Sequence, residues 1–552
     1  MKTHKKNILL IVTILIATVC LNFSDGYFEV SKNLEIFSNL YRELNIYYVD
    51  DTNPGELMKS GIDAMLKTLD PYTNYIPESD IEDYRFMTTG QYGGIGSLIM
   101  KRDSFVVISE PYENSPAAKG GLKAGDKIIS VDGKSAVGKK TEELSKILKG
   151  EPGTQLELIV NRPGFEENIA LKITRDKIKI NDVPYYGVVG DSTGYIKLTS
   201  FTETASKEVK ESFVNLKEAG SINSIILDLR GNGGGLLREA VNIVNLFVEK
   251  GQEVVTTKGK IPEMQNIYRT LNEPLDEKIP LIVLIDQGSA SASEIVSGTI
   301  QDLDRGIVIG DNSFGKGLVQ QTKDLGYNSK LKVTVAKYYT PSGRCIQRLD
   351  YANKDEKGYA TEVADSLIAE FKTKNGRPVF DGAGITPDIN VEVNPAAKIT
   401  RSLVQKNLLF DYATEFCLDN DSIESPDNFH LTKKDYESFL SFIEDKDYDY
   451  TTQSEVLLEK LSKTAESENY FKNIEFEFNE LSKKIEEQKK EDVLAYEEEI
   501  RLILENEIVS RYYYQTGRIQ ASLATDKDVL KAIDICTNKL QYDSILTPTI
   551  AN

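Results

Sequence analysis

The chain has 552 residues, 40% apolar and 28% charged, which is ordinary for a globular protein of roughly three or four domains. Its formal net charge of -20 argues against nucleic acid or an anionic membrane surface as the main partner. The two histidines are His4 and His430, which disfavours a Ser-His-Asp enzyme or a histidine-rich zinc site. The four cysteines show no CxxC spacing, so neither a metal knuckle nor a disulfide framework is indicated.

The N-terminus has the pattern of an export signal. A basic stretch, MKTHKK, precedes an apolar run over residues 8–19, which suits a signal peptide and is short for a membrane span. We expect residues 1–24 to be a signal peptide, with an uncleaved anchor over residues 8–23 as the alternative. A lipoprotein role for Cys20 is weaker, because bulky Val19 precedes it. Either main alternative predicts export to the periplasm or cell envelope, at the inner membrane if anchored.

Four regions follow in chain order. Residues 27–87 place apolar side chains at three- and four-residue steps, which predicts a helical N-terminal domain. Residues 88–175 change to short strand-like runs with glycine turns. Residues 176–390 alternate strands and helices, which predicts a layered α/β domain. Residues 391–552 carry most of the net negative charge and show helical periodicity, so we expect an acidic helical C-terminal domain. The fold class is multidomain α+β.

The segment LIDQGSASASEIVSG, residues 284–298, passes from a buried strand through small residues into a helix. Small residues permit a tight turn that places one hydroxyl at the helix N-terminus. The partial positive charge there stabilises a developing alkoxide or oxyanion. Taken alone, such a cluster is more often a serine-rich helix cap.

The segment GIVIGDNSFGKGLVQQ, residues 306–321, sets Lys316 between Gly315 and Gly317. Close backbone packing there can bury the amine, and burial lowers a lysine pKa toward the range of a general base. An exposed loop lysine is the plainer alternative. A phosphate-binding P-loop is disfavoured, because Gly317 stands where Ser or Thr must bind magnesium.

The segment LDLRGNGGGLLREA, residues 227–240, runs from a strand through four glycines into a helix. Such a turn exposes successive backbone N–H groups, which can bind an oxyanion or a phosphate. A plain glycine-rich turn is the alternative for this motif by itself.

Together these three motifs resemble the carboxyl-terminal processing peptidases, also called tail-specific proteases. YYTPSGRCIQ (338–347) and GITPD (384–388) also match, and the resemblance covers roughly residues 30–390. It implies a crotonase-like or ClpP-like α/β core, Ser291 as nucleophile and Lys316 as base, with no cofactor and no metal. The chemistry of amide hydrolysis agrees with these roles, because lysine is the remaining general base when no usable histidine is present.

The same resemblance assigns further positions. Gln320 matches the residue that orients the lysine. The backbone N–H groups of Ala292 and Gly233, or less securely Gly234, are the implied oxyanion donors. Asp302 matches a position implicated in some members, with a structural role as the alternative.

QYGGIGSLI (91–99) and SPAAKGGLKAGDKIISVDGK (115–134) look like a PDZ domain. A glycine loop ahead of a strand can present N–H groups to a peptide carboxylate, and the peptide would add as a further strand. The expected peptide-binding residues are Gly93, Gly94, Ile95, Gly96, Leu98, Leu144, Ile147 and Leu148. Arg162 is matched to a PDZ arginine that takes part in switching. A PDZ domain that packs on the core without a ligand is the alternative.

We therefore expect an exported serine endopeptidase that forms a seryl acyl-enzyme and recognises protein substrates by their free C-termini. One alternative is a non-catalytic PDZ scaffold, against which intact Ser291, Lys316 and Gln320 argue. A nucleotide-binding enzyme is the other, and Gly317 argues against it. Membrane anchoring and a homo-oligomer stay open, and nucleic acid is not an expected partner.

Overall fold

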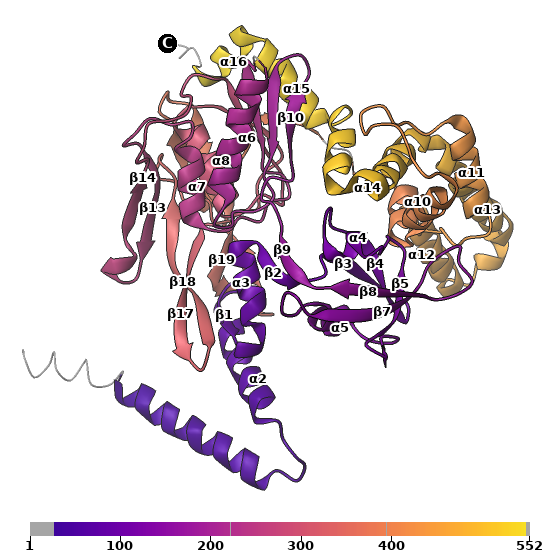
Figure 1. Cartoon of the computed structure of the whole chain (residues 1–552), viewed down its shortest axis with the longest axis horizontal. Helices are drawn as coiled ribbons and strands as arrows, with labels where there is room; N and C mark the ends of the chain where they lie inside the picture. The colour runs from indigo at the N-terminus through magenta and orange to yellow at the C-terminus, as the bar shows by residue number, and fades with distance from the viewer. Residues whose placement is uncertain (1–26, 221, 393–394, 548–552) are drawn as a thin grey trace, which may run out of the picture. The chain divides into compact units, whose positions relative to one another are not determined.

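The computed structural model describes residues 27–220, 222–392 and 395–547, and Figure 1 colours the chain from end to end. The chain forms two compact units. The first contains the described residues up to Ile81 together with Gln320–Thr334, and the second contains Glu82–Val319 and the residues from Val335 onward. The predicted signal peptide and the alternative anchor lie outside the described residues.

The first unit combines helices with a short β-pairing. Residues 27–47 are helical. Helix α2 (Pro54–Lys67) begins after Asn53, whose side chain accepts two backbone N–H groups and so caps the helix. Strand β1 (Asn74–Ile76) pairs antiparallel with Lys330–Lys332. The helical prediction for this region therefore holds for its two long helices, whereas β1 was not foreseen.

The region predicted to be a PDZ domain contains a six-stranded antiparallel sheet in the order β3-β4-β5-β7-β8, with β6 paired to β5. Its strands are β3 (Ser97–Arg102), β4 (Phe105–Pro111), β5 (Lys127–Val131), β6 (Lys134–Ser135), β7 (Gln155–Asn161) and β8 (Ile169–Thr174). Helices α4 (Pro116–Lys119) and α5 (Thr141–Leu148) cover it. Before and after it, β2 (Gln91–Gly94) pairs with β9 (Asp176–Lys179). Strand β3 lies at the edge of this sheet.

The predicted protease core is built on a second six-stranded sheet in the order β10-β11-β12-β15-β16-β23. Strand β10 is antiparallel to β11, and the remaining neighbours are parallel. The strands are β10 (Tyr185–Val189), β11 (Thr193–Lys197), β12 (Ser224–Asp228), β15 (Leu281–Ile285), β16 (Ile307–Gly310) and β23 (Ile389–Asn390). Nearly all residues of the four central strands are buried, as expected for parallel strands covered on both faces.

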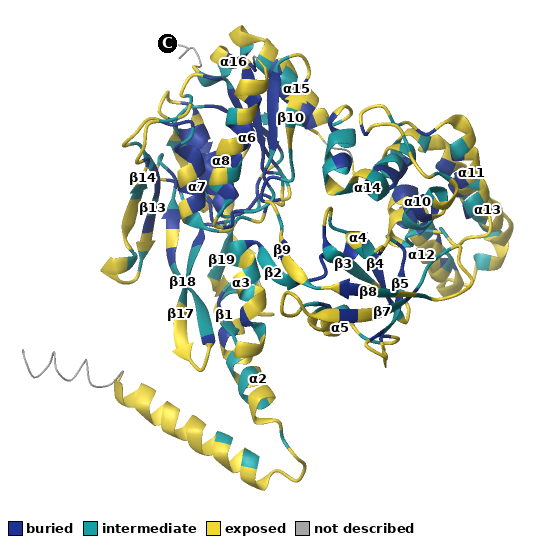
Figure 2. Cartoon of the chain, viewed as in Figure 1, coloured by how far each residue is buried: buried dark blue, intermediate teal, exposed yellow. Residues whose placement is uncertain are grey.

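Helices cover both faces of this sheet. On one face lie α6 (Ala205–Ala219), α7 (Leu237–Val244) and α8 (Ala292–Asp302), which pack side by side (Figure 1). Side chains such as Ile225 and Val283 point to that face. Their neighbours Ile226 and Ile282 point to the other face, where α15 (Lys527–Thr537) and α16 (Lys539–Leu546) pack. Figure 2 shows the buried centre of this arrangement in dark blue.

Smaller pairings surround the core. Strands β13 (Glu253–Gly259) and β14 (Asn266–Arg269) pair with each other, and β13 also pairs with the end of β18 (Ser329–Tyr339). Strand β17 (Leu318–Gly326) pairs with β18. The short pairs are β19 (Leu349–Lys354) with β20 (Ala360–Glu362), and β21 (Glu370–Lys372) with β22 (Pro378–Phe380). Helix α3 (Ile81–Thr89) precedes the PDZ-like region.

The acidic C-terminal region is helical, as predicted, but its helices divide between two cores. Its first helices are α9 (Lys398–Gln405), α10 (Leu408–Asp419), α11 (Lys433–Ile443), α12 (Gln453–Ser467), α13 (Phe471–Ala495) and α14 (Glu497–Leu523). Most of these share a core that contains Leu403, Phe439 and Ile500. Helices α15 and α16 instead complete the protease core, because their apolar faces cover its sheet. The predicted domain limits otherwise stay predictions.

Among the described helices, none combines the length and the apolar character that a membrane crossing requires.

Candidate active site

Ser291 lies on a strained turn between β15 and α8. Its backbone has φ 56° and ψ -109°, a conformation that costs a non-glycine residue about 1–3 kcal/mol. The residue is the N-cap of α8, and every residue of that helix is buried while Ser291 itself is only half-buried. A strained strand-to-helix turn of this kind is typical of an exposed nucleophile.

The structure separates Ser291 from the serines on either side of it. The Ser289 hydroxyl donates to the carbonyl oxygen of Leu229 at 2.8 Å, and the Ser293 hydroxyl donates to that of Asn232 at 2.8 Å. Both serines are fully buried. They therefore serve the packing of the turn, and the middle serine is the one that remains accessible.

One carboxylate joins the turn of Ser291 to the loop of Lys316. Oε2 of Glu294 accepts the backbone N–H of Ser291 at 2.7 Å and that of Lys316 at 2.9 Å. Oε1 accepts the hydroxyl of Ser313 at 2.5 Å and the N–H of Gly315 at 2.7 Å. Glu294 is fully buried. The backbone N–H groups of the two predicted catalytic residues thus donate to the same side chain.

Opposing influences act on this carboxyl group. Burial is the largest of them and raises the pKa of Glu294 above the ordinary value of a glutamate, while the four hydrogen bonds act against it. All four neighbours are donors toward it, so the ionised form satisfies every one of them. Tyr338, fully buried nearby, donates its hydroxyl to the carbonyl oxygen of Ser291 at 3.1 Å. Burial, with a contribution from Glu294, raises the pKa of Tyr338.

Close packing explains the two glycines that flank Lys316. Gly315 has φ 86°, and a Cβ there would lie 2.5 Å from the Cβ of Arg348. A Cβ on Gly317 would lie 2.9 Å from the backbone nitrogen of Gln347. Lys316 itself is half-buried. Larger residues at either flank would therefore displace the loop that carries the lysine.

The motifs YYTPSGRCIQ and GITPD contact the segments that carry the predicted site residues. Within GITPD, the backbone of Ile385 exchanges hydrogen bonds with Ser313, whose hydroxyl accepts its N–H at 2.6 Å. Within YYTPSGRCIQ, Arg344 forms an almost fully buried ion pair with Asp302 at 2.8 Å. Asp302 also accepts the N–H of Ser342 at 3.0 Å. These contacts support the structural alternative for Asp302.

The GNGGG turn packs directly against Ser291. Gly234 has φ 95°, and a Cβ there would lie 2.6 Å from the carbonyl oxygen of Ala290 and 2.9 Å from the nitrogen of Ala292. The Gly234 N–H already donates to Oδ1 of Asn232 at 2.9 Å. Gly233 is exposed. The geometry thus favours Gly233 with Ala292 over Gly234 as the oxyanion donors, and their role stays a prediction.

Gln320 belongs to the first compact unit, whereas Lys316 belongs to the second. Inside its own unit, the side-chain amide of Gln320 donates to the hydroxyl of Thr334 at 3.2 Å. Its predicted action on Lys316 stays a prediction.

The PDZ-like region holds a cavity of about 220 Å³ between the edge strand β3 and helix α5. Of the predicted peptide-binding residues, Ile95, Leu98 and Leu148 line it. The remaining lining residues are Phe86, Tyr92, Ser97, Ile99, Tyr112, Ser145 and Lys149. Sequence reasoning missed the aromatic residues: Phe86 and Tyr112 lie outside the quoted motifs, and Tyr92 directly precedes the glycines without any apolar repeat to mark it.

The other predicted groove residues have different surroundings. Gly93 and Gly94 lie in β2 and pair with β9. Leu144 is fully buried in the PDZ-like core. Ile147 is 36% exposed, and Gly96 has φ 74° at the loop before β3. The assignment of these residues to peptide binding stays a prediction.

Arg162 is engaged inside the PDZ-like region. Its guanidinium contacts both oxygens of the buried Asp126, at 2.7 and 2.8 Å, and donates to the carbonyl oxygen of Gly121 at 2.7 Å. Its switching role stays a prediction, and a switch through Arg162 would have to break this pair.

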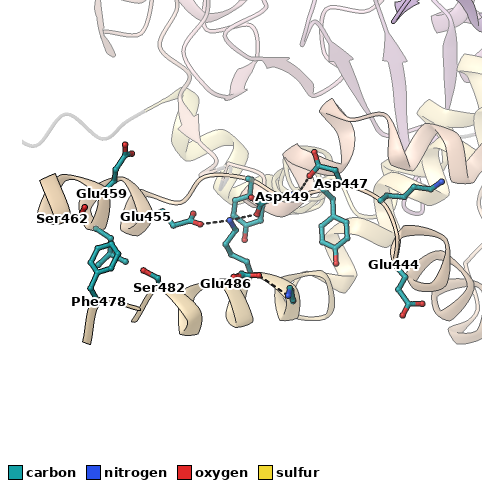
Figure 3. Close-up of a pocket in the computed structure, with 15 residues that line it drawn as sticks. Glu444, Asp447, Asp449, Glu455, Glu459, Ser462, Phe478, Ser482 and Glu486 are labelled. Carbon is teal, nitrogen blue, oxygen red and sulfur yellow. Dashed lines mark hydrogen bonds and ion pairs between the residues drawn. The ribbon is translucent and has the colours of Figure 1, made fainter. Parts of the chain in front are cut away.

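A cavity of about 610 Å³ lies in the acidic helical region (Figure 3). Its lining comes from residues 444–490. Lys489, almost buried, contacts Asp449 at 2.5 Å and Glu455 at 2.8 Å. The predicted catalytic residues lie elsewhere in the chain, so the size of this cavity does not mark it as the catalytic site.

Within the described parts of the chain, no group of three or more His, Cys, Asp or Glu side chains is placed to hold a metal ion. The expectation of metal-free and cofactor-free chemistry stays a prediction.

Sequence reasoning missed Glu294, Tyr338 and Asn232 as residues that shape this site. A signal for Glu294 was present, because it stands three residues after Ser291, where a glutamate can accept the N–H of the helix cap. Tyr338 and Asn232 act through contacts between distant segments, which spacing alone does not reveal.

Three family models match separate parts of this chain. The model of peptidase family S41 matches residues 192–353, a PDZ domain model matches 107–162, and a model described as a probable PDZ-protease C-terminal helical domain matches 399–536. The carboxy-terminal-processing protease of Bartonella bacilliformis is 35% identical over 388 residues, which is 67% of this chain and 88% of that protein.

Two further similarities have narrower coverage or weaker superposition. A probable CtpA-like serine protease of Staphylococcus haemolyticus is 37% identical over 309 residues, which is 55% of this chain and 61% of that protein. The solved photosystem II D1 C-terminal processing protease is 28% identical, with coverage of 64% of this chain and 92% of that one and a TM-score of 0.35.

The matches to the peptidase and PDZ domain models and to the Bartonella relative define a serine-type peptidase with a PDZ domain. The chain belongs to peptidase family S41. The predicted family, the enzyme class and the multidomain α+β architecture are thereby confirmed.

Proposed function

We propose that the chain hydrolyses peptide bonds with Ser291 as nucleophile and Lys316 as general base, and that it processes the C-termini of exported proteins. The observation that supports this most is the buried Glu294 carboxylate, which accepts the backbone N–H groups of both residues. It joins two loops whose predicted catalytic residues are 25 positions apart in sequence. Precise mutual placement of nucleophile and base is what acyl transfer requires.

The proposed reaction has two halves. The neutral Lys316 amine takes the proton of the Ser291 hydroxyl as the oxygen attacks the scissile carbonyl carbon. The backbone N–H groups of Ala292 and Gly233 stabilise the oxyanion. Lys316 then gives the proton to the leaving amine, and an acyl-serine remains. In the second half, Lys316 takes a proton from a water molecule as that water attacks the ester carbon. It returns the proton to the Ser291 oxygen as the C–O bond breaks, which releases the acid product and restores both side chains.

Substrate selection is proposed to use the PDZ-like groove. The edge strand β3 can accept a peptide as an additional strand, and the cavity beside it presents Leu98, Leu148 and aromatic rings to the last side chain. Lys149 also lines the cavity, and its ammonium group pairs with Asp83 at 2.6 Å, so a carboxylate at the chain end would have to share this cation. The relatives named carboxy-terminal-processing proteases support the same reaction class.

Labelling and peptide binding test the two parts separately. An active-site serine reagent should label the wild type and fail to label Ser291→Ala. With the full-length Ser291→Ala protein, a peptide with a free carboxylate should bind about 10- to 100-fold more tightly than the same peptide with an amidated end. Labelling at another serine would contradict the nucleophile, and equal binding of both peptides would contradict carboxylate recognition.

The proposed location is outside the cytoplasm. It follows from the basic and apolar pattern at the N-terminus. Cell fractionation should find the full-length chain in the periplasm or cell envelope. A chain that lacks residues 8–23 should no longer be found there. Retention of both forms in the cytoplasm would contradict it.

A further inference from the structure

The arginine that precedes the glycine turn is held by the last part of the chain. Arg230 stands next to Gly231, the first residue of the GNGGG turn. Its Nη1 lies 2.9 Å from Oδ1 of Asp526 and 2.8 Å from Oδ2 of Asp528. Asp526 caps α15, and Asp528 lies in its first turn. A helix almost 300 positions away thus reaches the turn that is proposed to supply an oxyanion donor.

The other side of the guanidinium binds the end of strand β12. Nη2 of Arg230 lies 2.6 Å from Oδ2 of the fully buried Asp228, and Tyr195 donates its hydroxyl to the same oxygen at 2.7 Å. Burial would raise the pKa of Asp228, but Lys197 and Arg230 together hold it below its ordinary value. Arg230 therefore bridges three carboxylates from two distant segments, with its side chain 17% exposed.

The backbone that follows Arg230 leads directly to the catalytic turn. The N–H of Gly231 donates to Asp286 at 2.8 Å. The carbonyl oxygen of Asn232 accepts the N–H of Ala290 at 3.0 Å, and Gly234 then packs on Ser291. A shift of Arg230 would pass through this short, hydrogen-bonded segment to the exposed residue Gly233.

Apolar packing holds α15 in place independently of its carboxylates. Val529, Ala532 and Ile535 of this helix are fully buried against the core sheet. Neutralising Asp526 and Asp528 would therefore leave the helix on the sheet and remove the ion pairs that Arg230 makes with it, while the bonds of Arg230 to Asp228 remain. Variants of the two aspartates can therefore test how the glycine turn is positioned without unfolding the region.

We propose that Asp526 and Asp528 are positioning residues for peptide hydrolysis, which act by holding Arg230 and so fixing the oxyanion-binding turn. The inference rests on the function proposed above and extends the active site to the far C-terminal segment. Both residues lie beyond the 192–353 match to the peptidase family model, so the chemistry of this chain would depend on a part outside that region.

The test replaces the two aspartates by asparagine, alone and together, in the full-length chain. Asparagine caps a helix as well as aspartate does, so Asp526→Asn retains the cap and loses the charge. We expect the double variant to lower kcat by about 10- to 100-fold, the loss typical of a misplaced catalytic group. KM and peptide binding by the PDZ-like region should change by less than about 2-fold, since neither involves the turn. Asp528→Glu, which keeps the charge, should retain most of the kcat of the wild type.

Asp534→Asn is the matched control, because Asp534 lies on the same helix, is exposed and pairs with Lys531. A double variant with the kcat of this control would overturn the inference, as would a loss of kcat fully explained by an increased unfolded fraction in thermal melting. Ser291→Ala measured in parallel separates the two proposals. Without Ser291-dependent hydrolysis by the wild type, both fall. With it, unchanged turnover of the aspartate variants overturns this inference alone.

Discussion

The catalytic loops and the PDZ-like groove lie in the same compact unit, yet they position their functional groups in different ways. Around Ser291 and Lys316, backbone amides converge on the buried carboxylate of Glu294. In the groove, an edge strand and a helix present partly exposed side chains such as Leu98 to a cavity. Substitutions around Ser291 and Lys316 should therefore cause large losses of kcat. Substitutions in the groove should cause smaller losses of peptide affinity.

The largest effects are expected from the proposed nucleophile and base. Ser291→Ala, Lys316→Ala and Lys316→Arg should each lower kcat by more than about 1,000-fold, because the bond-forming oxygen or the neutral amine is lost. Arginine fails because a guanidinium does not deprotonate near neutral pH. Hydrolysis of a chromogenic peptide measures the loss. Ser297→Ala, a buried serine on α8, is the control, and wild-type turnover by any of the three variants would refute the Ser–Lys pair.

Glu294→Gln should lower kcat because it disturbs the loops that carry Ser291 and Lys316. Four donors surround the two oxygens, so an amide must turn its NH2 group toward two of them in either orientation. We expect kcat to fall about 100-fold and the free energy of unfolding to fall by about 2–4 kcal/mol.

Urea unfolding and peptide hydrolysis measure the two effects of that substitution. Glu239→Gln is its control, since Glu239 is also buried and hydrogen-bonded, but to Ser206 and Asn242 of the core. It should lose stability without a comparable loss of kcat at temperatures where it is folded. Equal loss of kcat in both variants would show that Glu294 has no particular role in the catalytic loops.

Two neighbouring glycines offer a sharper contrast within the catalytic region. Gly234→Ala introduces a Cβ 2.6 Å from the carbonyl oxygen of Ala290, at a φ of 95°, and should lower kcat about 10- to 100-fold. Gly233→Ala meets open space and keeps its N–H, so its kcat should stay within about 3-fold of the wild type. Initial rates at saturating peptide give both values. The reverse order would contradict the assigned packing of the turn.

The difference between the regions also marks what the sequence could predict. Ser291, Lys316 and the glycine turn stand in short motifs that were joined into one site by their resemblance to a known family, and the loops that carry them do meet in the second unit. The groove was predicted from apolar periodicity, which does not distinguish fully buried Leu144 from the partly exposed Leu98. Contacts between distant segments, such as Arg230 with Asp526, depend on tertiary packing and left no local signal.

The smallest effects on function are expected in the groove, where Leu98 and Leu144 separate binding from folding. Leu98 is 46% exposed and lines the cavity, whereas Leu144 is fully buried. Leu98→Ala should weaken binding of a free-acid peptide to the Ser291→Ala background by about 5-fold, which corresponds to about 1 kcal/mol of lost apolar contact. Its unfolding free energy should change by less than about 0.5 kcal/mol. Leu144→Ala should instead cost about 2–5 kcal/mol of stability. Isothermal titration and urea unfolding measure the pair. If Leu98→Ala left peptide affinity unchanged, the peptide would not use the cavity beside β3, and the groove would have to be sought on another face of the domain.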